Sequence, residues 1–363
     1  MPTAATLESA EEIYTYLRAR LRDVVPDVEL RYKAELAAEI NVLKRERNAL
    51  ILGHNYMEPA LFHSIADVGG DSLELSRAAA KTDKDIIVFC GVRFMAETAK
   101  ILNPTRTVLL PTVRGGCSLA DGITAADVRA LRAQYPGVPV VTYINTSADV
   151  KAESDIICTS GNAARVVESL DTDTVIFLPD EYLAGNVARA TGRNIIFPTR
   201  TVPHRMEVPG PTMKVPGFSP GLQHTLVGWN ARCEVHDKFT VEDVENVRRQ
   251  FPDTVILAHP ECRPEVVAVV DFTGSTSAMI DYVERTNAPR YLLLTECSMG
   301  DNVAAANQDK DMLRMCSVRC PHMNEITLED TLESLRQTRY VIEIPEDIQQ
   351  RARLALDRML AVG

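Results

Sequence analysis

ALILGHNY (residues 49–56), PVVTYINT (139–146) and TVILAHPE (254–261) are three stretches of the chain built on one plan. Each is an apolar run with the length of a buried β-strand, and each ends in a pair of polar residues at positions i and i+2. In a strand, this spacing places both side chains on the same face. The three stretches therefore predict three strands that each present two polar side chains at the carboxyl end.

The same plan continues after each stretch. A second apolar run leads through a turn of small residues into a helical pattern: DIIVFC (85–90), DIIC (155–158) and VVDFTG (269–274). A third run follows: TVLLPT (107–112), TVIFLPD (174–180) and RYLLLT (290–295). We interpret this series as an internal triplication with a period of about 90 to 115 residues. Alternating strands and helices are typical of parallel α/β proteins. The sequence thus predicts an α/β fold of three three-layer units, each with a small three-stranded parallel sheet, related by a pseudo-threefold axis around a central metal-cluster site.

The triplication divides the chain into five parts. We expect an N-terminal helical segment over residues 1–47, three α/β units over 48–137, 138–237 and 238–328, and C-terminal helices over 329–363. One long irregular stretch, 199–227, is rich in proline and glycine, which predicts a lid or a surface excursion.

The composition excludes several classes of protein. Of the 363 residues, 45% are apolar and 25% are charged, which is typical of a globular protein. A formal net charge of −11 argues against a nucleic-acid partner, because phosphate binding requires clustered Lys and Arg. No secretory signal and no uncharged apolar run of about 18 residues is present, so we expect no membrane association. A cytoplasmic protein with reduced thiols is the expectation.

The eight cysteines occupy two kinds of position. Cys90 and Cys158 end apolar runs, so we interpret them as buried core residues. Cys117, Cys233 and Cys320 instead lie in polar loops, one after the third strand of each unit. Because ligands gather at the carboxyl ends of parallel strands, these three cysteines are expected to converge on one central point. The remaining cysteines, Cys262, Cys297 and Cys316, stay unassigned.

Three thiolates from three units suit an iron–sulfur cluster. A [4Fe–4S] cluster with three protein thiolates keeps one iron open, and an open iron can act as a Lewis acid in dehydration. His236 and His322 lie close to two of these cysteines, so a mixed Cys/His zinc site remains the alternative. The small-residue turns TSGN (159–162) and TGSTS (273–277) open helices and offer N–H donors to a small carboxylate or phosphate.

A set of motifs matches a known family in content and order. The motifs are GHNYMEPALFH (53–63), GDSLELSRAA (70–79), CSLAD (117–121), YINTSADVKAESDIICTSGNA (143–163), CEVHDKFT (233–240), HPEC (259–262), GSTSAMI (274–280) and CPHMNEITL (320–328). Over about residues 48–330 the chain resembles the quinolinate synthase (NadA) family. The resemblance implies three homologous units around a [4Fe–4S] cluster. It also implies condensation of iminoaspartate with dihydroxyacetone phosphate to quinolinate, phosphate and water in de novo NAD biosynthesis.

The resemblance also implies roles for individual residues. The cluster ligands fall on Cys117, Cys233 and Cys320. The substrate-binding positions fall on His54, Ser72, Tyr143, Ile144, Asn145, Ser160, His259, Pro260, Glu261 and Thr276. Glu261 and His259 are the candidates for general base and general acid, and Tyr56 and Tyr143 for orienting substrate or relaying a proton.

The implied partners are small molecules, with an aspartate-oxidising enzyme as the source of iminoaspartate, and a homodimer is compatible with the sequence. Two other functions remain open. One is a different open-iron hydro-lyase acting on a small acid, and the other is a cluster-binding redox sensor without turnover. The polar pairs at the strand ends disfavour the sensor, because a sensor needs no converging Tyr, His and Glu.

Overall fold

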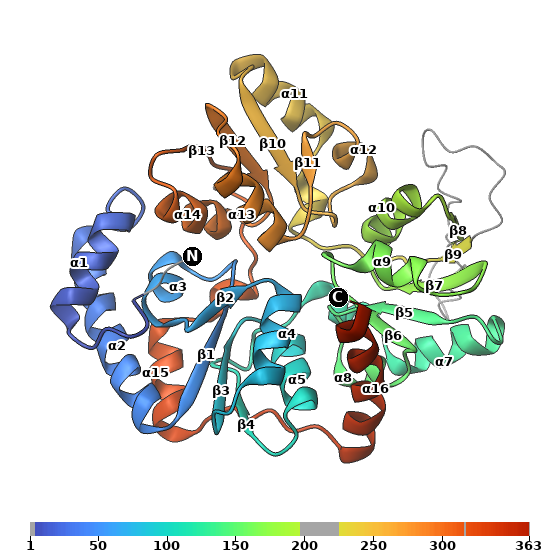
Figure 1. Cartoon of the computed structure of the whole chain (residues 1–363), viewed down its shortest axis with the longest axis horizontal. Helices are drawn as coiled ribbons and strands as arrows, with labels where there is room; N and C mark the ends of the chain where they lie inside the picture. Colours follow the sequence, from blue (N-terminus) through green and yellow to red (C-terminus); the bar gives the residue numbers. More distant parts are fainter. Residues whose placement is uncertain (1–3, 197–224, 316, 363) are drawn as a thin grey trace, which may run out of the picture.

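The computed structural model describes residues 4–196, 225–315 and 317–362, and contains three separate sheets in three lobes (Figure 1). Every strand pairing within these sheets is parallel. The first sheet has the order β2-β1-β3-β4, formed by β1 (Ala49–His54), β2 (Val68–Gly70), β3 (Ile86–Cys90) and β4 (Thr107–Leu109). The predicted class, α/β units with small parallel sheets, is confirmed.

The other two sheets repeat this order. The second is β6-β5-β7-β9-β8, formed by β5 (Val140–Tyr143), β6 (Ile156–Cys158), β7 (Thr174–Leu178), β8 (Asn194–Ile196) and β9 (Thr225–Val227). The third is β11-β10-β12-β13, formed by β10 (Thr254–Ala258), β11 (Phe272–Thr273), β12 (Arg290–Leu294) and β13 (Asp311–Leu313). In each sheet the first strand of the unit lies between a short edge strand and a longer central strand.

Two details of the predicted triplication are wrong. The sheets have four, five and four strands rather than three. In addition, β3 occupies the position of β7 and β12. The predicted repeat had instead made it equivalent to β6 and β11. The true counterpart of β6 and β11 is β2, which has only three residues, two of them glycine, and therefore carries no apolar signal.

A repeated aspartate contact marks the correct equivalence of the strands. An aspartate stands directly before each edge strand, and its side chain accepts a hydrogen bond from a backbone N–H of the neighbouring first strand. The three contacts are Ile51 N to Asp67 Oδ2 at 2.8 Å, Val140 N to Asp155 Oδ2 at 2.7 Å and Ile256 N to Asp271 Oδ2 at 2.8 Å. The same contact in all three units shows that the repeat is structural.

Helices cover the sheets and join the lobes. The expected N-terminal helices are present as α1 (Ala10–Leu21) and α2 (Asp27–Glu46), and the C-terminal helices as α15 (Leu328–Gln337) and α16 (Glu346–Val362). Helix α15 lies against α2 beside the first sheet, and α16 lies along α8 (Ala148–Ala152) beside the second, so the chain returns to its beginning (Figure 1). Within the described residues, every helix is too short or too polar to span a membrane. Most of the predicted lid, residues 199–227, lies outside the described residues.

Candidate functional site

The loops that carry Cys117, Cys233 and Cys320 are attached to the three units by the same hydrogen bond. The helices α5 (Arg93–Leu102), α10 (Glu181–Thr191) and α14 (Cys297–Ala306) each follow a central strand. The first N–H of each helix donates to the carbonyl two residues before a cysteine. These bonds are Arg93 N to Gly115 O at 2.7 Å, Glu181 N to Ala231 O at 2.8 Å and Cys297 N to Val318 O at 2.9 Å. The three cysteines therefore hold equivalent positions.

The chain leaves the three cysteines in the same way. Seven residues after each of them, a threonine caps the next helix and accepts a hydrogen bond from the N–H of an aspartate three residues further on. The pairs are Thr124 and Asp127 at 3.3 Å, Thr240 and Asp243 at 3.2 Å, and Thr327 and Asp330 at 3.1 Å. The capped helices are α7 (Ala125–Gln134), α11 (Val241–Gln250) and α15. Each cysteine loop is thus fixed at both ends, by a backbone hydrogen bond before the cysteine and by a threonine cap after it.

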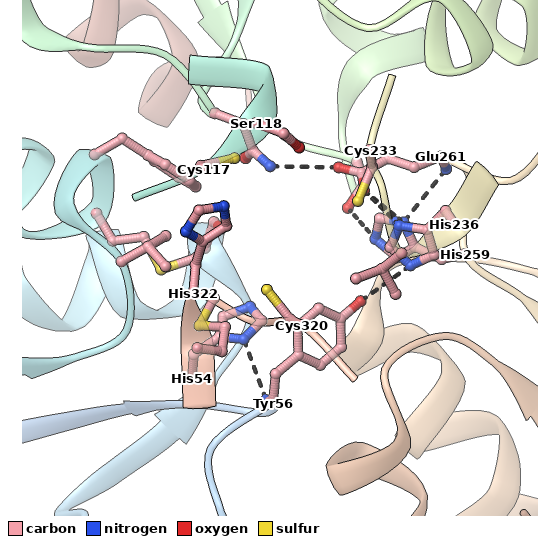
Figure 2. A pocket seen from close by; sticks show the side chains of 18 of the residues that line it. His54, Tyr56, Cys117, Ser118, Cys233, His236, His259, Glu261, Cys320 and His322 are labelled. Atoms are coloured by element: carbon pink, nitrogen blue, oxygen red, sulfur yellow. Dashed lines mark hydrogen bonds and ion pairs between the residues drawn. The ribbon is translucent and has the colours of Figure 1, made fainter. Parts of the chain in front are cut away.

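The three sulfur atoms face one cavity (Figure 2). All three cysteines line it, and no cysteine in the described part of the chain forms a disulfide. Burial raises the pKa of Cys117 to about 12 and that of Cys320 to about 11, and it raises the pKa of Cys233 as well. In the absence of metal these thiols stay protonated, whereas a bound metal would displace their protons.

The other cysteines lie elsewhere. Cys90 and Cys158 are fully buried, as expected, and Cys262 and Cys297 are buried too. None of these four lines the cavity. Cys316 lies outside the described residues, so its role stays unassigned.

The six polar residues predicted at the strand ends meet at the same cavity. In two units the local geometry is identical: the N–H of Tyr56 donates to Nδ1 of His54 at 3.2 Å, and the N–H of Glu261 donates to Nδ1 of His259 at 3.3 Å. Each ring therefore uses Nδ1 as an acceptor and carries its proton on Nε2. In the second unit the two polar residues are Tyr143 and Asn145, and Tyr143 occupies the position of the two histidines.

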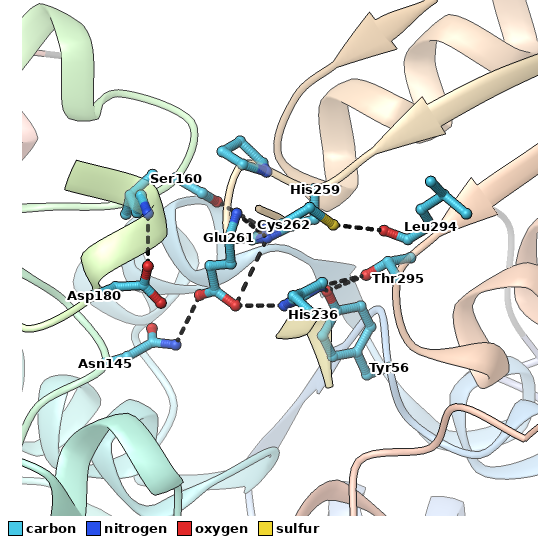
Figure 3. A network of polar contacts seen from close by, with 12 residues as sticks. Tyr56, Asn145, Ser160, Asp180, His236, His259, Glu261, Cys262, Leu294 and Thr295 are labelled. Atoms are coloured by element: carbon cyan, nitrogen blue, oxygen red, sulfur yellow. Dashed lines mark hydrogen bonds and ion pairs between the residues drawn. The ribbon is translucent and has the colours of Figure 1, made fainter. Parts of the chain in front are cut away.

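Glu261 is the centre of a polar network (Figure 3). Its carboxylate lies 2.6 Å from Nδ1 of His236 and accepts a hydrogen bond from Nδ2 of Asn145 at 3.4 Å. Burial by itself raises the pKa of this carboxyl group, but His236, His259 and the hydroxyl of Tyr143 outweigh it and hold the pKa below its ordinary value, at about 2. Glu261 is therefore ionised at neutral pH, although its side chain is almost completely buried.

Two tyrosines and two histidines that line the cavity with this carboxylate are neutral at neutral pH. The hydroxyl of Tyr56 lies 2.5 Å from Oγ1 of Thr295 and 3.3 Å from Nε2 of His236. Burial, together with Glu261, raises the pKa of Tyr56 and of Tyr143 well above 10. Burial lowers the pKa of His54 and of His259 to about 3. The buried carboxylate thus shares the cavity with the neutral phenols of Tyr56 and Tyr143 and the neutral imidazoles of His54 and His259.

His236 and Thr295 are the site residues that the sequence did not assign to the polar network. His236 connects two elements of the network, because Nδ1 contacts Glu261 while Nε2 lies 3.0 Å from Oγ1 of Thr295. Its ring also stacks on His259, with ring centroids 4.5 Å apart. The signal for His236 was present in CEVHD, but the sequence reading treated this histidine only as a candidate zinc ligand.

The remaining predicted binding residues separate into two groups. Ser72, Ser160 and Thr276 line the cavity. Ser72 and Thr276 are the first residues of α4 (Ser72–Lys81) and α13 (Thr276–Arg285), so each lies just inside a helix N-terminus. Ile144 and Pro260 do not line the cavity: Ile144 is a core residue, and the carbonyl of Pro260 accepts a hydrogen bond from Asn186. A contact of these two with substrate stays a prediction.

The residues present can hold a metal in two ways. Cys117, Cys233 and Cys320 offer three sulfur ligands from three units. Cys233, His236 and Glu261 offer a sulfur, a nitrogen and an oxygen whose ligand atoms all lie within 4.8 Å of one another. The donor chemistry of the first set suits an iron–sulfur cluster, and that of the second set suits zinc. The two sets share only Cys233.

Comparison with known proteins agrees with this geometry. The family model described as "Quinolinate synthetase A protein" matches residues 38–361. The chain belongs to the quinolinate synthase family. It is 51% identical to quinolinate synthase 2 of Mesorhizobium japonicum over 347 residues, which cover 96% of this chain and 97% of that protein. It is 49% identical to quinolinate synthase 1 of the same organism over 99% of this chain and 100% of that protein. A quinolinate synthase of Xylella fastidiosa is 48% identical over 88% of this chain and 85% of that protein. The chain is thus an enzyme of a family that serves NAD biosynthesis.

Proposed function

We propose that this protein condenses iminoaspartate with dihydroxyacetone phosphate to quinolinate, with release of phosphate and water, and that it does so with a [4Fe–4S] cluster bound by Cys117, Cys233 and Cys320. The observation that carries the proposal is the identical attachment of the three cysteine loops to α5, α10 and α14. Three equivalent thiols around one cavity are what a cluster with three protein ligands requires.

The same observation favours the cluster over zinc. A zinc ion on Cys233, His236 and Glu261 would leave two of the three equivalent cysteines without a role and would occupy the carboxylate of Glu261. When bound, a cluster with three thiolates supplies an open iron that acts as a Lewis acid during dehydration. Under this assignment Glu261 stays available to substrate.

The protein's own residues would carry the proton transfers. Glu261 is ionised at neutral pH and lines the cavity, so its carboxylate is available to accept a proton from a carbon next to a carbonyl or imine group. Tyr56 and Tyr143 keep their protons, so they can donate hydrogen bonds to substrate oxygen atoms. His259 carries its N–H on Nε2, 3.2 Å from Oγ of Ser160, where the neutral ring can donate a hydrogen bond to a carboxylate group, and a general-acid role would require the ring to be protonated first.

The helix N-termini at the cavity suit anionic substrates. Ser72 and Thr276 begin α4 and α13, and each helix has ten residues. At α13 the N–H groups and the helix dipole attract carboxylate and phosphate groups, whereas at α4 the carboxylate of Asp71 already accepts from the N–H groups of Leu73 and Glu74. Both substrates are anions, so binding at this side of the cavity would orient their reactive carbons toward Glu261.

Several wider features belong to the same proposal. The division of the chain at residues 47, 137, 237 and 328 follows from the triplication. Iminoaspartate, an unstable imine, would come from an aspartate-oxidising enzyme in the same compartment, which we take to be the cytoplasm. A homodimer is the proposed assembly.

The test is a product assay under anaerobic conditions. The holo protein is incubated with both substrates, and quinolinate is measured by chromatography against a standard. We expect quinolinate and one equivalent of phosphate for each turnover, and no quinolinate when either substrate is omitted. A protein that holds its cluster but forms no quinolinate would contradict the proposal and favour a hydro-lyase acting on another small acid.

A further inference from the structure

Lys151 is a fully buried cation that takes no part in the proposed proton transfers or substrate contacts. It lies in α8, and none of its surface is accessible to solvent. Its Nζ donates a hydrogen bond to the carbonyl of Thr146. Among the described residues, no carboxylate oxygen lies within the ion-pair distance of 4.0 Å of this ammonium group. A buried ammonium without a direct counter-ion is costly by several kcal/mol, so its presence calls for an explanation.

The surroundings place Lys151 behind the wall of the metal cavity. Its Nζ lies 5.5 Å from the ring centroid of Phe94, and Phe94 lines the cavity together with Cys117. Helix α5, which carries Phe94, also holds the loop before Cys117 through the bond from Arg93 N to Gly115 O. The charge of a Cys117 thiolate reaches Lys151, where it raises the pKa against the lowering effect of burial.

Two carboxylates, Glu97 and Asp149, raise the pKa of Lys151 more than Cys117 does, and the one with the larger effect, Glu97, is already bound on both oxygens. Oε1 of Glu97 accepts from Nε of Arg93 at 2.9 Å, and Oε2 accepts from the N–H of Ala148 at 2.9 Å. Glu97 therefore neutralises Lys151 only at a distance. The pKa of Lys151 is lowered to about 8, mainly by burial, so the group remains mostly protonated at pH 7.

A covalent role for Lys151 does not fit. A lysine that forms a Schiff base must reach the substrate, and Lys151 does not line the cavity. Its position suits an electrostatic role, in which the charge acts through the cavity wall.

We propose that Lys151 is a positioning cation that compensates the negative charge of the thiolates at the metal cavity and raises the reduction potential of the bound cluster. The proposal rests on the cluster assigned under the proposed function. Three thiolates bring three negative charges into a buried space, and the reduction potential of an iron–sulfur centre depends on the net charge and burial around it. Removing a nearby positive charge makes addition of an electron less favourable, so the potential falls.

The experiment measures the reduction potential of the cluster in anaerobic holo protein by titration followed by electron paramagnetic resonance. Lys151→Met should lower the potential by at least the equivalent of about a tenfold change in the reduction equilibrium, which is 59 mV for one electron. Lys151→Arg keeps the charge and should stay close to the wild-type value. Glu97→Gln removes a negative charge from the same region and should shift the potential in the opposite direction.

Lys81→Met is the matched control, because it removes the same charge from an exposed position at the end of α4. It should leave the potential unchanged. A purely structural role for Lys151 predicts loss of cluster or stability without opposite shifts in Lys151→Met and Glu97→Gln. If Lys151→Met does not fold, Lys151→Gln and Glu97→Gln carry the same comparison.

An intact cluster with the wild-type reduction potential in Lys151→Met would overturn the proposal. Shifts of the potential in the same direction in Lys151→Met and Glu97→Gln would also overturn it. Absence of a cluster from the wild-type protein is a different result, visible before any variant is made. It would overturn the proposed function and this inference together.

Discussion

The cysteine loops and the strand ends face the same cavity, but the threefold repeat is kept in the loops and is lost in the side chains of the strand ends. The three cysteine loops are alike in sequence position, in the backbone bond that holds them and in the threonine cap that follows. The three strand ends share their backbone position, and two of them share a histidine, but no two carry the same pair of side chains. Their side chains differ from unit to unit: His54 with Tyr56, Tyr143 with Asn145, and His259 with Glu261.

This difference suggests a division of labour. A cluster with three equivalent protein ligands is served by threefold repetition, so the repeat is retained where the metal would bind. Two unlike substrates that join and then cyclise need unlike partners, so the repeat is lost where they would bind. The asymmetric side also holds the carboxylate of Glu261, which contacts His236 and has a lowered pKa.

The largest effect is expected from the symmetric side. Cys117→Ser, Cys233→Ser and Cys320→Ser should each abolish both the visible absorbance of the cluster and the activity, because a hydroxyl is a much poorer ligand for iron than a thiolate. The measurement is the absorbance spectrum and iron content of protein reconstituted without oxygen.

Cys90→Ser and Cys158→Ser are the matched controls, since both thiols are buried away from the cavity. They should retain iron. If one of the three cysteine variants kept its cluster, the three loops would not be equivalent in binding it. Loss of the cluster in Cys316→Ser but not in Cys320→Ser would identify a different third ligand.

The next largest effect is expected from the asymmetric side. Glu261→Gln keeps the size of the side chain and removes the basic carboxylate, so turnover should fall by about 100-fold or more. The cluster should remain, because no sulfur ligand is changed. Steady-state quinolinate formation and iron content are measured on the same preparation. Near-normal turnover would exclude Glu261 as the base, and loss of metal would instead favour the site formed with Cys233 and His236.

A smaller effect is expected on stability as a function of pH. The pKa of His54 is held near 3 in the folded protein by burial, against about 6.5 in the unfolded chain. As the pH falls, His54 takes up a proton in the unfolded chain before it does so in the folded protein. Its contribution to the free energy of unfolding is therefore fully present above pH 6.5 and is lost as the pH falls toward 3. In the metal-free protein, His54→Gln should reduce the slope of unfolding free energy against pH by about 1.4 kcal/mol per pH unit between these limits. The free energy of unfolding is measured by denaturant titration at several pH values. If its slope against pH is the same for the wild type and for His54→Gln, His54 is not held neutral.

The smallest effect tests the repeat itself. Thr124→Ala, Thr240→Ala and Thr327→Ala each remove a helix cap, which should lower the free energy of unfolding by about 1 kcal/mol. Similar values for all three, with Ser at each position restoring most of the loss, are expected from equivalent geometry. A loss at one position several times larger than at the others would show that the three caps are not equivalent.

Much of the fold could be predicted, because long apolar runs such as 49–54 and 254–258 carry a strong signal. Two of the edge strands, β6 and β11, lie in the runs predicted at 155–158 and 269–274, whereas β2 was not predicted. β2 consists of Val68 and two glycines, and β11 has only two residues, so both depend on pairing with a neighbouring strand rather than on their own composition. This weakness caused the mismatch of β3 with β6 and β11. The return of α15 to the first sheet also depends on contacts between residues far apart in the sequence.

For the site, the sequence predicted which residues meet but not how they are connected. Cys117, Cys233, Cys320 and the strand-end pairs all line the cavity. The link from Glu261 through His236 to Thr295 was missed, because three loops of two units have to come together before it exists. Thr295 follows an apolar strand, and nothing in its sequence neighbourhood distinguishes it from an ordinary strand end.

The most direct test of a three-cysteine cluster is its iron spectrum with and without product. Holo protein is prepared with ⁵⁷Fe, and Mössbauer spectra are recorded alone and with saturating pyridine-2,3-dicarboxylate. With thiolates on three irons, only the fourth can exchange a ligand, so the spectrum should change at one iron site and stay unchanged at the other three. The change should weaken in His259→Ala if this residue helps to hold the carboxylate of the product. Spectra that do not respond to product, or a protein that contains zinc in place of iron and sulfide, would contradict the assignment of the three cysteines to an open-site cluster.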